Sequence, residues 1–119
     1  LEESLHGDKL KTARRLFTKK IITSLPDVII TSNDLIAQGI ISAAHENGIN
    51  IPNDMQITGF DDLLSSAYFI PSVTTVSQNI DELAKRCFSM LMDLINKKSS
   101  VSSIIEQNII ARNSAKINI

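Results

Sequence analysis

The sequence is poor in the residues that build disulfides, metal sites and aromatic cores. It has one cysteine, two histidines, no tryptophan and only 4% aromatic residues in 119. A single cysteine cannot form an internal disulfide, and one cysteine with two histidines cannot close a structural zinc site. No apolar run approaches the ~20 residues that a membrane span requires. The composition therefore excludes a disulfide scaffold, a zinc module and a membrane span as the basis of this fold.

The chain also lacks an excess of charge of either sign. Its 12 Lys and Arg residues face 13 Asp and Glu residues, for a formal net charge of −1. A protein that grips a nucleic acid backbone needs a concentrated basic face, so we expect no DNA contact by these residues. The cations at positions 14, 15, 19 and 20 form one cluster, which we interpret as an ordinary solvated helix face.

β-branched aliphatic residues are abundant, with 19 isoleucines in 119 residues, a density typical of buried strands. Apolar runs alternate with helical stripes, which predicts an α/β fold: a mostly parallel sheet with helices on both faces. We expect helices over 8–24, 35–47, a short stretch ending at 69, and 79–95. We expect strands over 28–31, 55–58, 73–76 and 104–110.

Three local patterns refine this prediction. The continuous apolar run at 28–31 is typical of a strand buried on both faces. Asn79 and Glu82 have the spacing of a capping box at the start of the last helix. Cys87 lies inside the apolar stripe of that helix, so we interpret it as a core residue and not as a reactive thiol.

Polar side chains directly follow three of the expected strands. Asn33 and Asp34 follow the first, Asp61 and Asp62 the second, and Gln78 the third. Ligands of open α/β sheets bind at the carboxyl ends of the strands, so we expect these side chains to converge on one rim. Carboxylates and amides supply both acceptors and donors, which suits a polyhydroxylated ligand. A phosphate fits poorly, because the rim lacks Lys, Arg and a Gly-rich loop.

Each of these residues also has a purely structural interpretation. Asn33 or Asp34 can cap the second helix, and Asp61 or Asp62 can occupy a turn. Gln78 alone is a weak signal. The ligand hypothesis therefore depends on the three positions taken together.

Catalytic interpretations have less support. An Asp pair after a strand can hold Mg²⁺, but such phosphoryl-transfer sites add a Lys near a third strand end, and none stands there. Ser65 and Ser66 lack a nucleophile-elbow pattern. His6 lies near the start of the chain and His45 on the polar side of a helix, so neither receives a role. We expect no enzyme, and we assign no catalytic residue, metal ligand or cofactor.

Three ordered segments resemble the lactose-repressor/galactose-repressor (LacI/GalR) family of bacterial transcription regulators. They are Pro26–Gly39, Gly48–Asp62 and Pro71–Gln78, within a resemblance that runs from residue 8 to 112. Sugar-binding proteins of transporters, of the ribose-binding type, share these segments in looser form and are the alternative. The resemblance implies the C-terminal part of a type I periplasmic-binding-protein-like effector domain.

The resemblance also implies how the chain is divided. Residues 1–78 would form an incomplete C-terminal effector-binding subdomain, residues 79–98 a helix crossing to the N-terminal subdomain, and residues 99–119 a returning strand and polar tail. The DNA-binding head and the N-terminal subdomain would lie outside these residues. The absence of an initiator methionine fits a piece of a longer protein.

Site residues and partners follow from the same resemblance. Asn33 stands where the family places an amide that contacts the effector, and Asp61 where it places the carboxylate that takes sugar hydroxyls. Gln78 stands at the crossing between subdomains, and Asp34 and Asp62 are rim or capping positions. The implied partners are a sugar or related effector, a second copy in a homodimer, and operator DNA through the head alone. The implied location is the cytoplasm, with no membrane contact.

The crossing helix raises a packing problem. Without the sheet of the other subdomain, the apolar side chains of 83–95 would be exposed, at ~1.5–3 kcal/mol for each large one. We therefore expect this helix to fold onto the chain's own sheet or to be buried between two chains.

Overall fold

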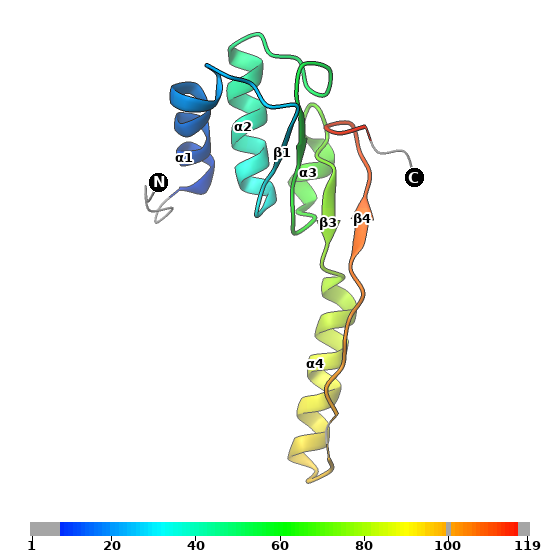
Figure 1. Cartoon of the computed structure of the whole chain (residues 1–119). Coiled ribbons are helices and arrows are strands. Elements are labelled where there is room, and N and C mark those ends of the chain that lie inside the picture. The colour runs from blue at the N-terminus through cyan, green and yellow to red at the C-terminus, as the bar shows by residue number, and fades with distance from the viewer. Residues whose placement is uncertain (1–7, 100, 117–119) are drawn as a thin grey trace.

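The structure, a computed structural model, describes residues 8–99 and 101–116. Helices and strands alternate along the chain, which confirms the predicted order (Figure 1). The first predicted helix ends in a π-helical turn, and the last predicted strand shortens to three residues. The helical elements are α1 (Lys9–Leu16), η1 (Phe17–Ile21), α2 (Asp34–Glu46), α3 (Leu64–Tyr68) and α4 (Ile80–Ile95). The strands are β1 (Val28–Ile30), β2 (Gln56–Thr58), β3 (Thr75–Ser77) and β4 (Asn108–Ile110).

The strands form two pairs that a bridge joins. β1 and β2 are parallel, with Ile29 opposite Ile57. β3 and β4 are antiparallel, with Val76 opposite Ile109. A single parallel bridge between Thr58 and Thr74 connects the two pairs. The sheet is therefore parallel where the chain crosses over through helices and antiparallel only where β4 returns.

The expected polar tail contributes to this sheet. Ser114 is fully buried. Its hydroxyl donates to the Ile57 carbonyl at 2.7 Å and accepts from the Thr74 amide at 2.8 Å, while the Ile57 amide donates to the Ser114 carbonyl at 2.9 Å. The tail thus joins β2 to the start of β3.

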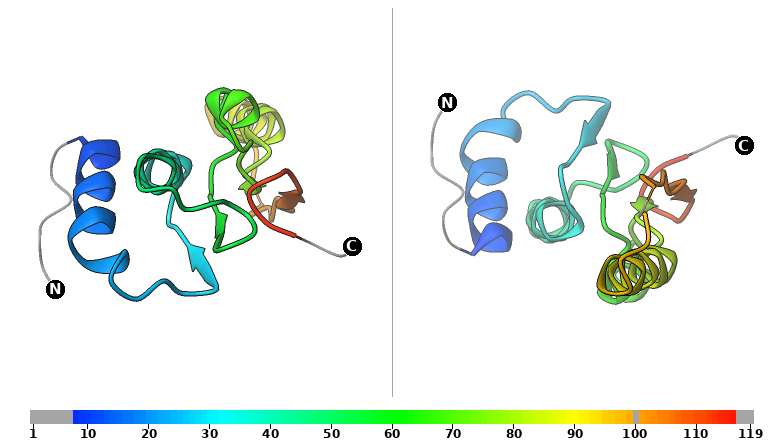
Figure 2. Two further views of the ribbon diagram at one scale, coloured as in Figure 1. Left: turned by 90° about the horizontal axis from the view of Figure 1, so that it is seen from above. Right: turned by 90° about the horizontal axis from the view of Figure 1, so that it is seen from below.

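The core lies between α1, α2 and one face of the β1–β2 pair (Figure 2). Phe17, Ile41 and Ile57 are almost completely buried there. The prediction that 28–31 is buried on both faces is wrong, because Val28 and Ile30 are 49% and 81% exposed. Only Ile29 of this strand packs against the core, so one face of β1 is open.

Helix α4 and the chain returning beside it extend away from the core. We call residues 79–99 and 101–107 the arm (Figure 1). The molecule measures 58 × 35 × 22 Å, with a radius of gyration of 17.9 Å, against about 13–14 Å for a compact chain of this length. The arm therefore accounts for the elongated shape.

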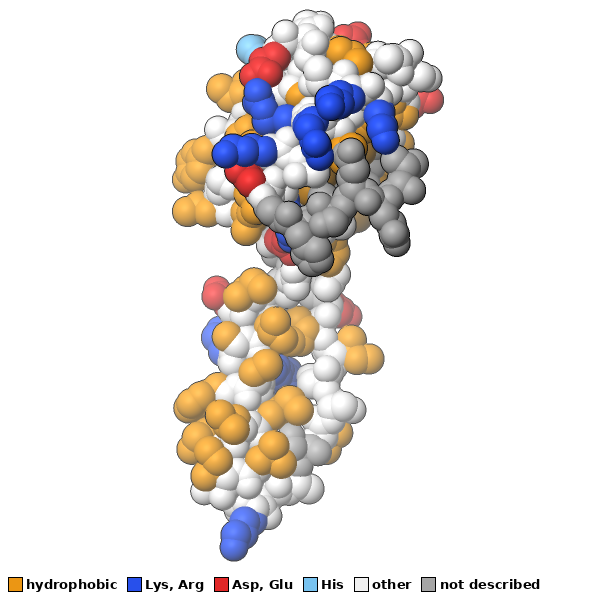
Figure 3. Space-filling view, turned by 90° about the vertical axis from the view of Figure 1, so that its left-hand side faces the viewer, with side chains coloured by type: hydrophobic (Ala, Val, Ile, Leu, Met, Phe, Trp, Pro, Cys, Tyr) orange, Lys and Arg blue, Asp and Glu red, His pale blue; other side chains and the backbone are white. Residues whose placement is uncertain are grey.

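The arm exposes its apolar side chains. No residue of α4 is buried, and Phe88, Leu91 and Ile95 are 66%, 54% and 63% exposed. Figure 3 shows apolar side chains along the arm and Lys and Arg side chains gathered above it. The prediction that this helix folds onto the chain's own sheet is wrong. Its burial between two chains stays a prediction.

Two further expectations about α4 are wrong. Cys87 is exposed and not part of the core, because α4 extends away from the core and none of its residues is buried. Asn79 precedes the helix in a left-handed conformation, with φ 50° and no side-chain hydrogen bond to the helix. Glu82 does not complete a capping box but pairs with Arg86 at 2.7 Å.

The close contact between α1 and α2 depends on Gly39. A Cβ atom at this position would lie 2.5 Å from the Leu10 carbonyl oxygen and 3.0 Å from the Ala13 Cβ. Both neighbours belong to a helix and cannot move aside independently. Side chains that overfill such a contact cost about 1–3 kcal/mol.

We predict that Gly39→Ala lowers the free energy of unfolding by about 1–3 kcal/mol, despite the better helix propensity of alanine. Urea denaturation followed by circular dichroism measures this change. Ser89→Ala on the exposed face of α4 is the control and should change stability by less than about 0.5 kcal/mol. A neutral or stabilising Gly39→Ala would show that α1 does not pack closely on α2.

Candidate functional site

The candidate site is built around the turn that joins β2 to α3. Two consecutive residues of this turn, Asp61 and Asp62, have positive φ angles of 109° and 55°. Non-glycine residues rarely adopt this region, and each costs about 1–3 kcal/mol unless the surroundings enforce it. We call residues 59–63 the 59–63 turn.

Backbone hydrogen bonds hold the 59–63 turn on both sides. The Gly59 amide donates to the Thr74 carbonyl at 2.8 Å, and the Asp61 amide donates to the Val76 carbonyl at 3.0 Å. On the other side, the Phe60 carbonyl accepts from the amide of residue 34 at 2.8 Å. The turn therefore bridges the start of α2 and strand β3.

Asp34 lies beneath this turn and ties it to its neighbours. Its side chain is fully buried in the first turn of α2. Oδ2 accepts hydrogen bonds from the Leu63 amide at 2.8 Å and the Ser66 hydroxyl at 2.7 Å. Oδ1 accepts from the Thr75 hydroxyl at 2.6 Å. A carboxylate with these three donors has its buried oxygens satisfied.

Two findings follow from the position of Asp34. It is neither the helix cap nor a rim residue, which corrects both expectations for this side chain, because it is buried under the turn. Gly59 is required beside it, since a Cβ atom there would lie 2.1 Å from Asp34 Oδ1.

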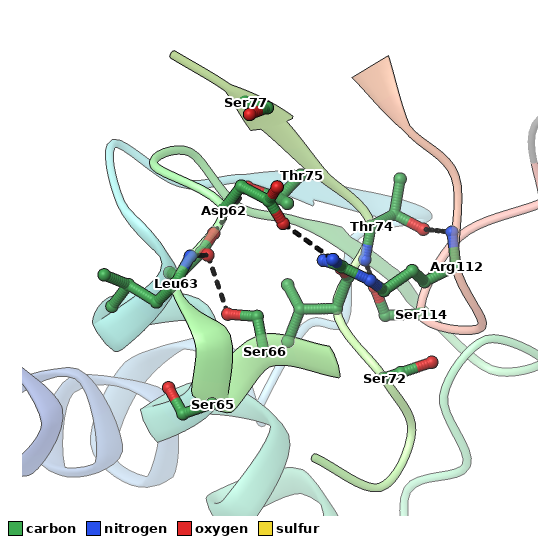
Figure 4. Close-up of polar contacts among 12 residues, drawn as sticks. Asp62, Leu63, Ser65, Ser66, Ser72, Thr74, Thr75, Ser77, Arg112 and Ser114 are labelled. Carbon is green, nitrogen blue, oxygen red and sulfur yellow. Dashed lines mark hydrogen bonds and ion pairs between the residues drawn. The ribbon is translucent and has the colours of Figure 1, made fainter. Parts of the chain in front are cut away.

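Asp62 forms an ion pair with Arg112, which follows β4 (Figure 4). Arg112 Nη2 lies 2.6 Å from Asp62 Oδ1, and the two side chains are 18% and 24% exposed. Arg112 Nη1 donates to the Val73 carbonyl at 2.9 Å. Asp62 is not the cap of α3, whose N-cap residue is Leu63, and its position at the rim stays a prediction.

The structure brings Asp61 and Gln78 together. Gln78 Nε2 donates to Asp61 Oδ1 at 2.5 Å, at the point where β3 leaves for the arm. Asn33 caps α2, because its Oδ1 accepts from the Ile36 amide at 3.0 Å, and its side chain is nearly buried. Asn33 directly precedes Asp34, whose amide donates to the Phe60 carbonyl. The carboxyl ends of β1, β2 and β3 thus contribute to one region.

A hollow of about 180 Å³ opens beside this region. Pockets for small ligands usually measure about 300–1,000 Å³, so this hollow alone is smaller than a usual ligand site. Its lining is mostly apolar and comes from residues Ile30, Thr31, Thr58, Gly59, Phe60, Thr74, Thr75, Val76 and Ile109.

Other kinds of site find no support in the described residues. In 8–99 and 101–116, no group of three or more His, Cys, Asp or Glu side chains is arranged to hold a metal ion. Within the same ranges, no helix has the length and apolar character needed to cross a membrane. His45 is exposed near the end of α2, and His6 lies outside the described residues.

Sequence reasoning missed the residues that support the site. Arg112 follows an antiparallel strand and lies 50 residues from Asp62, so no local spacing relates them. Thr75 and Ser66 bond to Asp34 across 41 and 32 residues. The one signal in the sequence is the pair of adjacent aspartates shortly after Gly59. Two neighbouring carboxylates indicate that other residues stabilise them, but they do not show which residues these are.

With this geometry established, known proteins identify the family. The model of the periplasmic binding protein-like domain family matches residues 2–115. The HTH-type transcriptional repressor PurR of Pasteurella multocida is 35% identical over 95 residues, which cover 78% of this chain and 28% of the repressor. The chain belongs to the periplasmic binding protein-like domain family, and its resemblance to LacI/GalR regulators is confirmed.

Solved structures agree with this assignment. A ribose operon repressor protein from Lactobacillus acidophilus has a TM-score of 0.81 at 30% identity, covering 93% of this chain and 41% of that protein. A LacI family transcriptional regulator from Enterococcus faecium, solved with bound ribose, has a TM-score of 0.81 at 25% identity, covering 89% and 40%. The chain spans about a quarter of the length of the repressors it matches in sequence.

We predict that Asp34→Ala lowers the free energy of unfolding by about 3 kcal/mol or more, because three buried donors lose their acceptor. Asp34→Asn keeps one acceptor oxygen and should destabilise the protein less than Asp34→Ala. Urea denaturation measures both, with Asp81→Ala on the exposed face of α4 as the control. If Asp34→Ala were as stable as the control, the carboxylate would not hold the turn.

Proposed function

We propose that this chain is the effector-sensing portion of a LacI/GalR-type DNA-binding transcriptional regulator. The observation that carries this proposal is the meeting of Asp61 and Gln78 at the carboxyl ends of the strands, in a chain of this family. The matched relatives are transcriptional repressors, which favours a regulator over a sugar-binding protein that serves a transporter.

In this proposal, Asp61, Gln78 and Asn33 bind the effector. The Asp61 carboxylate accepts hydrogen bonds from sugar hydroxyls, and the amides of Gln78 and Asn33 supply donors. The Gln78–Asp61 hydrogen bond holds the two side chains together at the carboxyl end of β3. A sugar or a related polyhydroxylated compound fits this inventory, and the ribose bound in the Enterococcus faecium regulator belongs to the same chemical class.

The remainder of the site belongs to other parts of the regulator. Residues 1–78 act as the C-terminal subdomain, 79–98 as the crossing helix and 99–119 as the returning strand and tail. The N-terminal subdomain closes the cleft and covers the apolar face of the arm. The regulator works in the cytoplasm as a homodimer, and a separate head contacts operator DNA. Effector binding shifts the population of cleft geometries and thereby the affinity for the operator.

The test is a thermal-shift screen of the full natural chain against pentoses, hexoses, disaccharides and purines. A compound at 100 times its Kd stabilises the folded protein by ~2.7 kcal/mol. We expect a sugar to raise the melting temperature and Asp61→Ala to abolish that rise while the unliganded protein stays folded. Asp27→Ala, which removes an exposed carboxylate before β1, is the matched control.

Two results would contradict the proposal. An undiminished shift in Asp61→Ala would place the effector elsewhere, and no shift with any compound would remove the sugar-binding function. The sequence upstream of these residues separates the two protein classes. A helix-turn-helix with a hinge indicates the regulator, whereas a signal peptide indicates the transporter protein.

A further inference from the structure

We propose that Arg112 is a positioning residue for Asp61, the residue whose carboxylate binds the effector, and that it acts through Asp62. This inference rests on the proposed function, because it concerns the same site. Arg112 itself is not a ligand contact in this proposal: its two terminal nitrogens are engaged within the protein. Its effect on the effector is therefore indirect.

Arg112 is held in one position from three directions. Nη2 contacts Asp62 Oδ1 at 2.6 Å, and Nη1 donates to the Val73 carbonyl at 2.9 Å. The Arg112 amide donates to the Thr74 hydroxyl, also at 2.9 Å. The guanidinium thus joins the start of β3 to the 59–63 turn, and it is only 18% exposed.

The ion pair holds Asp62, one of two residues in this turn whose backbone conformation is unfavourable. Asp62 has φ 55° and Asp61 has φ 109°, and such residues persist where the surroundings over-determine them. On one side of the two aspartates, the Asp34 carboxylate accepts a hydrogen bond from the Leu63 amide. On the other side, the Val76 carbonyl accepts one from the Asp61 amide. Arg112 is the group that holds the Asp62 side chain between these two anchors. Without it, Asp62 is free to relax, and the Asp61 carboxylate loses its fixed direction.

Gln78 and Arg112, which follow β3 and β4, bond successive residues of this turn. Gln78, at the end of the departing strand β3, bonds Asp61. Arg112, just after the returning strand β4, bonds Asp62. Because β4 is antiparallel to β3, Arg112 holds Asp62 at the end of the pair away from the arm, while effector contact with Asp61 acts on Gln78 at the base of the arm.

Ser114 provides a matched structural control, because it lies two residues from Arg112 in the same segment. It is fully buried, and its hydroxyl forms hydrogen bonds with Ile57 and Thr74 rather than with the 59–63 turn. Loss of its hydroxyl removes two buried hydrogen bonds without releasing Asp62. General weakening of this segment and specific release of the turn can thus be separated.

The experiment uses the full natural chain with four single variants: Arg112→Met, Arg112→Lys, Asp62→Asn and Ser114→Ala. The double variant Arg112→Met/Asp62→Asn completes a thermodynamic cycle. Calorimetric titration gives the Kd for D-ribose, or for the screened compound with the largest thermal shift. Amide hydrogen exchange over residues 59–63 is measured without any ligand.

We expect Arg112→Met and Asp62→Asn each to weaken binding about tenfold and to accelerate exchange over 59–63. The double variant should be no weaker than the weaker single variant, because both changes release the same contact. Arg112→Lys restores the charge but not the two-nitrogen geometry, and should recover part of the affinity. Ser114→Ala should lower the melting temperature while the Kd stays within twofold.

An Arg112→Met protein with a Kd within twofold of wild type would overturn the proposal. So would a Ser114→Ala protein that loses as much affinity as Arg112→Met. If no compound binds the wild-type chain, the proposed function fails, and hydrogen exchange decides the positioning role. Unchanged exchange over 59–63 in Arg112→Met would then overturn it.

Discussion

The buried carboxylate of Asp34 is the interaction on which the rest of the site depends. It accepts from the start of α3, from a hydroxyl within α3 and from a hydroxyl of β3, and its own helix bonds the turn through the backbone. Four elements therefore meet at one side chain. Its place in the first turn of α2 is favourable for a carboxylate, because the helix dipole is positive there.

This arrangement explains how two adjacent aspartates occupy an unfavourable backbone conformation. Asp34 lies beneath the 59–63 turn, β3 lies beside it, and Arg112 holds Asp62 at its end. Each contact alone is modest, but together they leave the turn few alternatives. A rigid turn presents the Asp61 carboxylate in one direction, which lowers the ordering cost of binding a ligand.

Sequence patterns predicted the elements and the expected ligand positions because both follow local rules. Strand-end reasoning reached Asp61 and Gln78, which contact each other. The same reasoning could not find Arg112, since the return of β4 beside β3 depends on pairing across the arm. It also misjudged Cys87 and the apolar stripe of α4, because periodicity shows that a helix has an apolar face and not which surface covers it. Asn79 failed as a cap because its backbone is left-handed, whereas a capping residue is typically extended, and its side chain makes no hydrogen bond to the helix.

The arm and the candidate site are connected through Gln78, which bonds Asp61. The arm extends from the core with an exposed apolar helix. Gln78 follows β3 at the base of the arm, whereas Arg112 follows β4 at the opposite end of this antiparallel pair. The two residues bond consecutive aspartates, and a displacement of the arm at Gln78 would change the environment of Asp61. Allosteric control requires a ligand to favour one of two arrangements. In the proposed regulator, an effector that binds Asp61 and Gln78 together would favour one arm position, because Gln78 stands at the base of the arm.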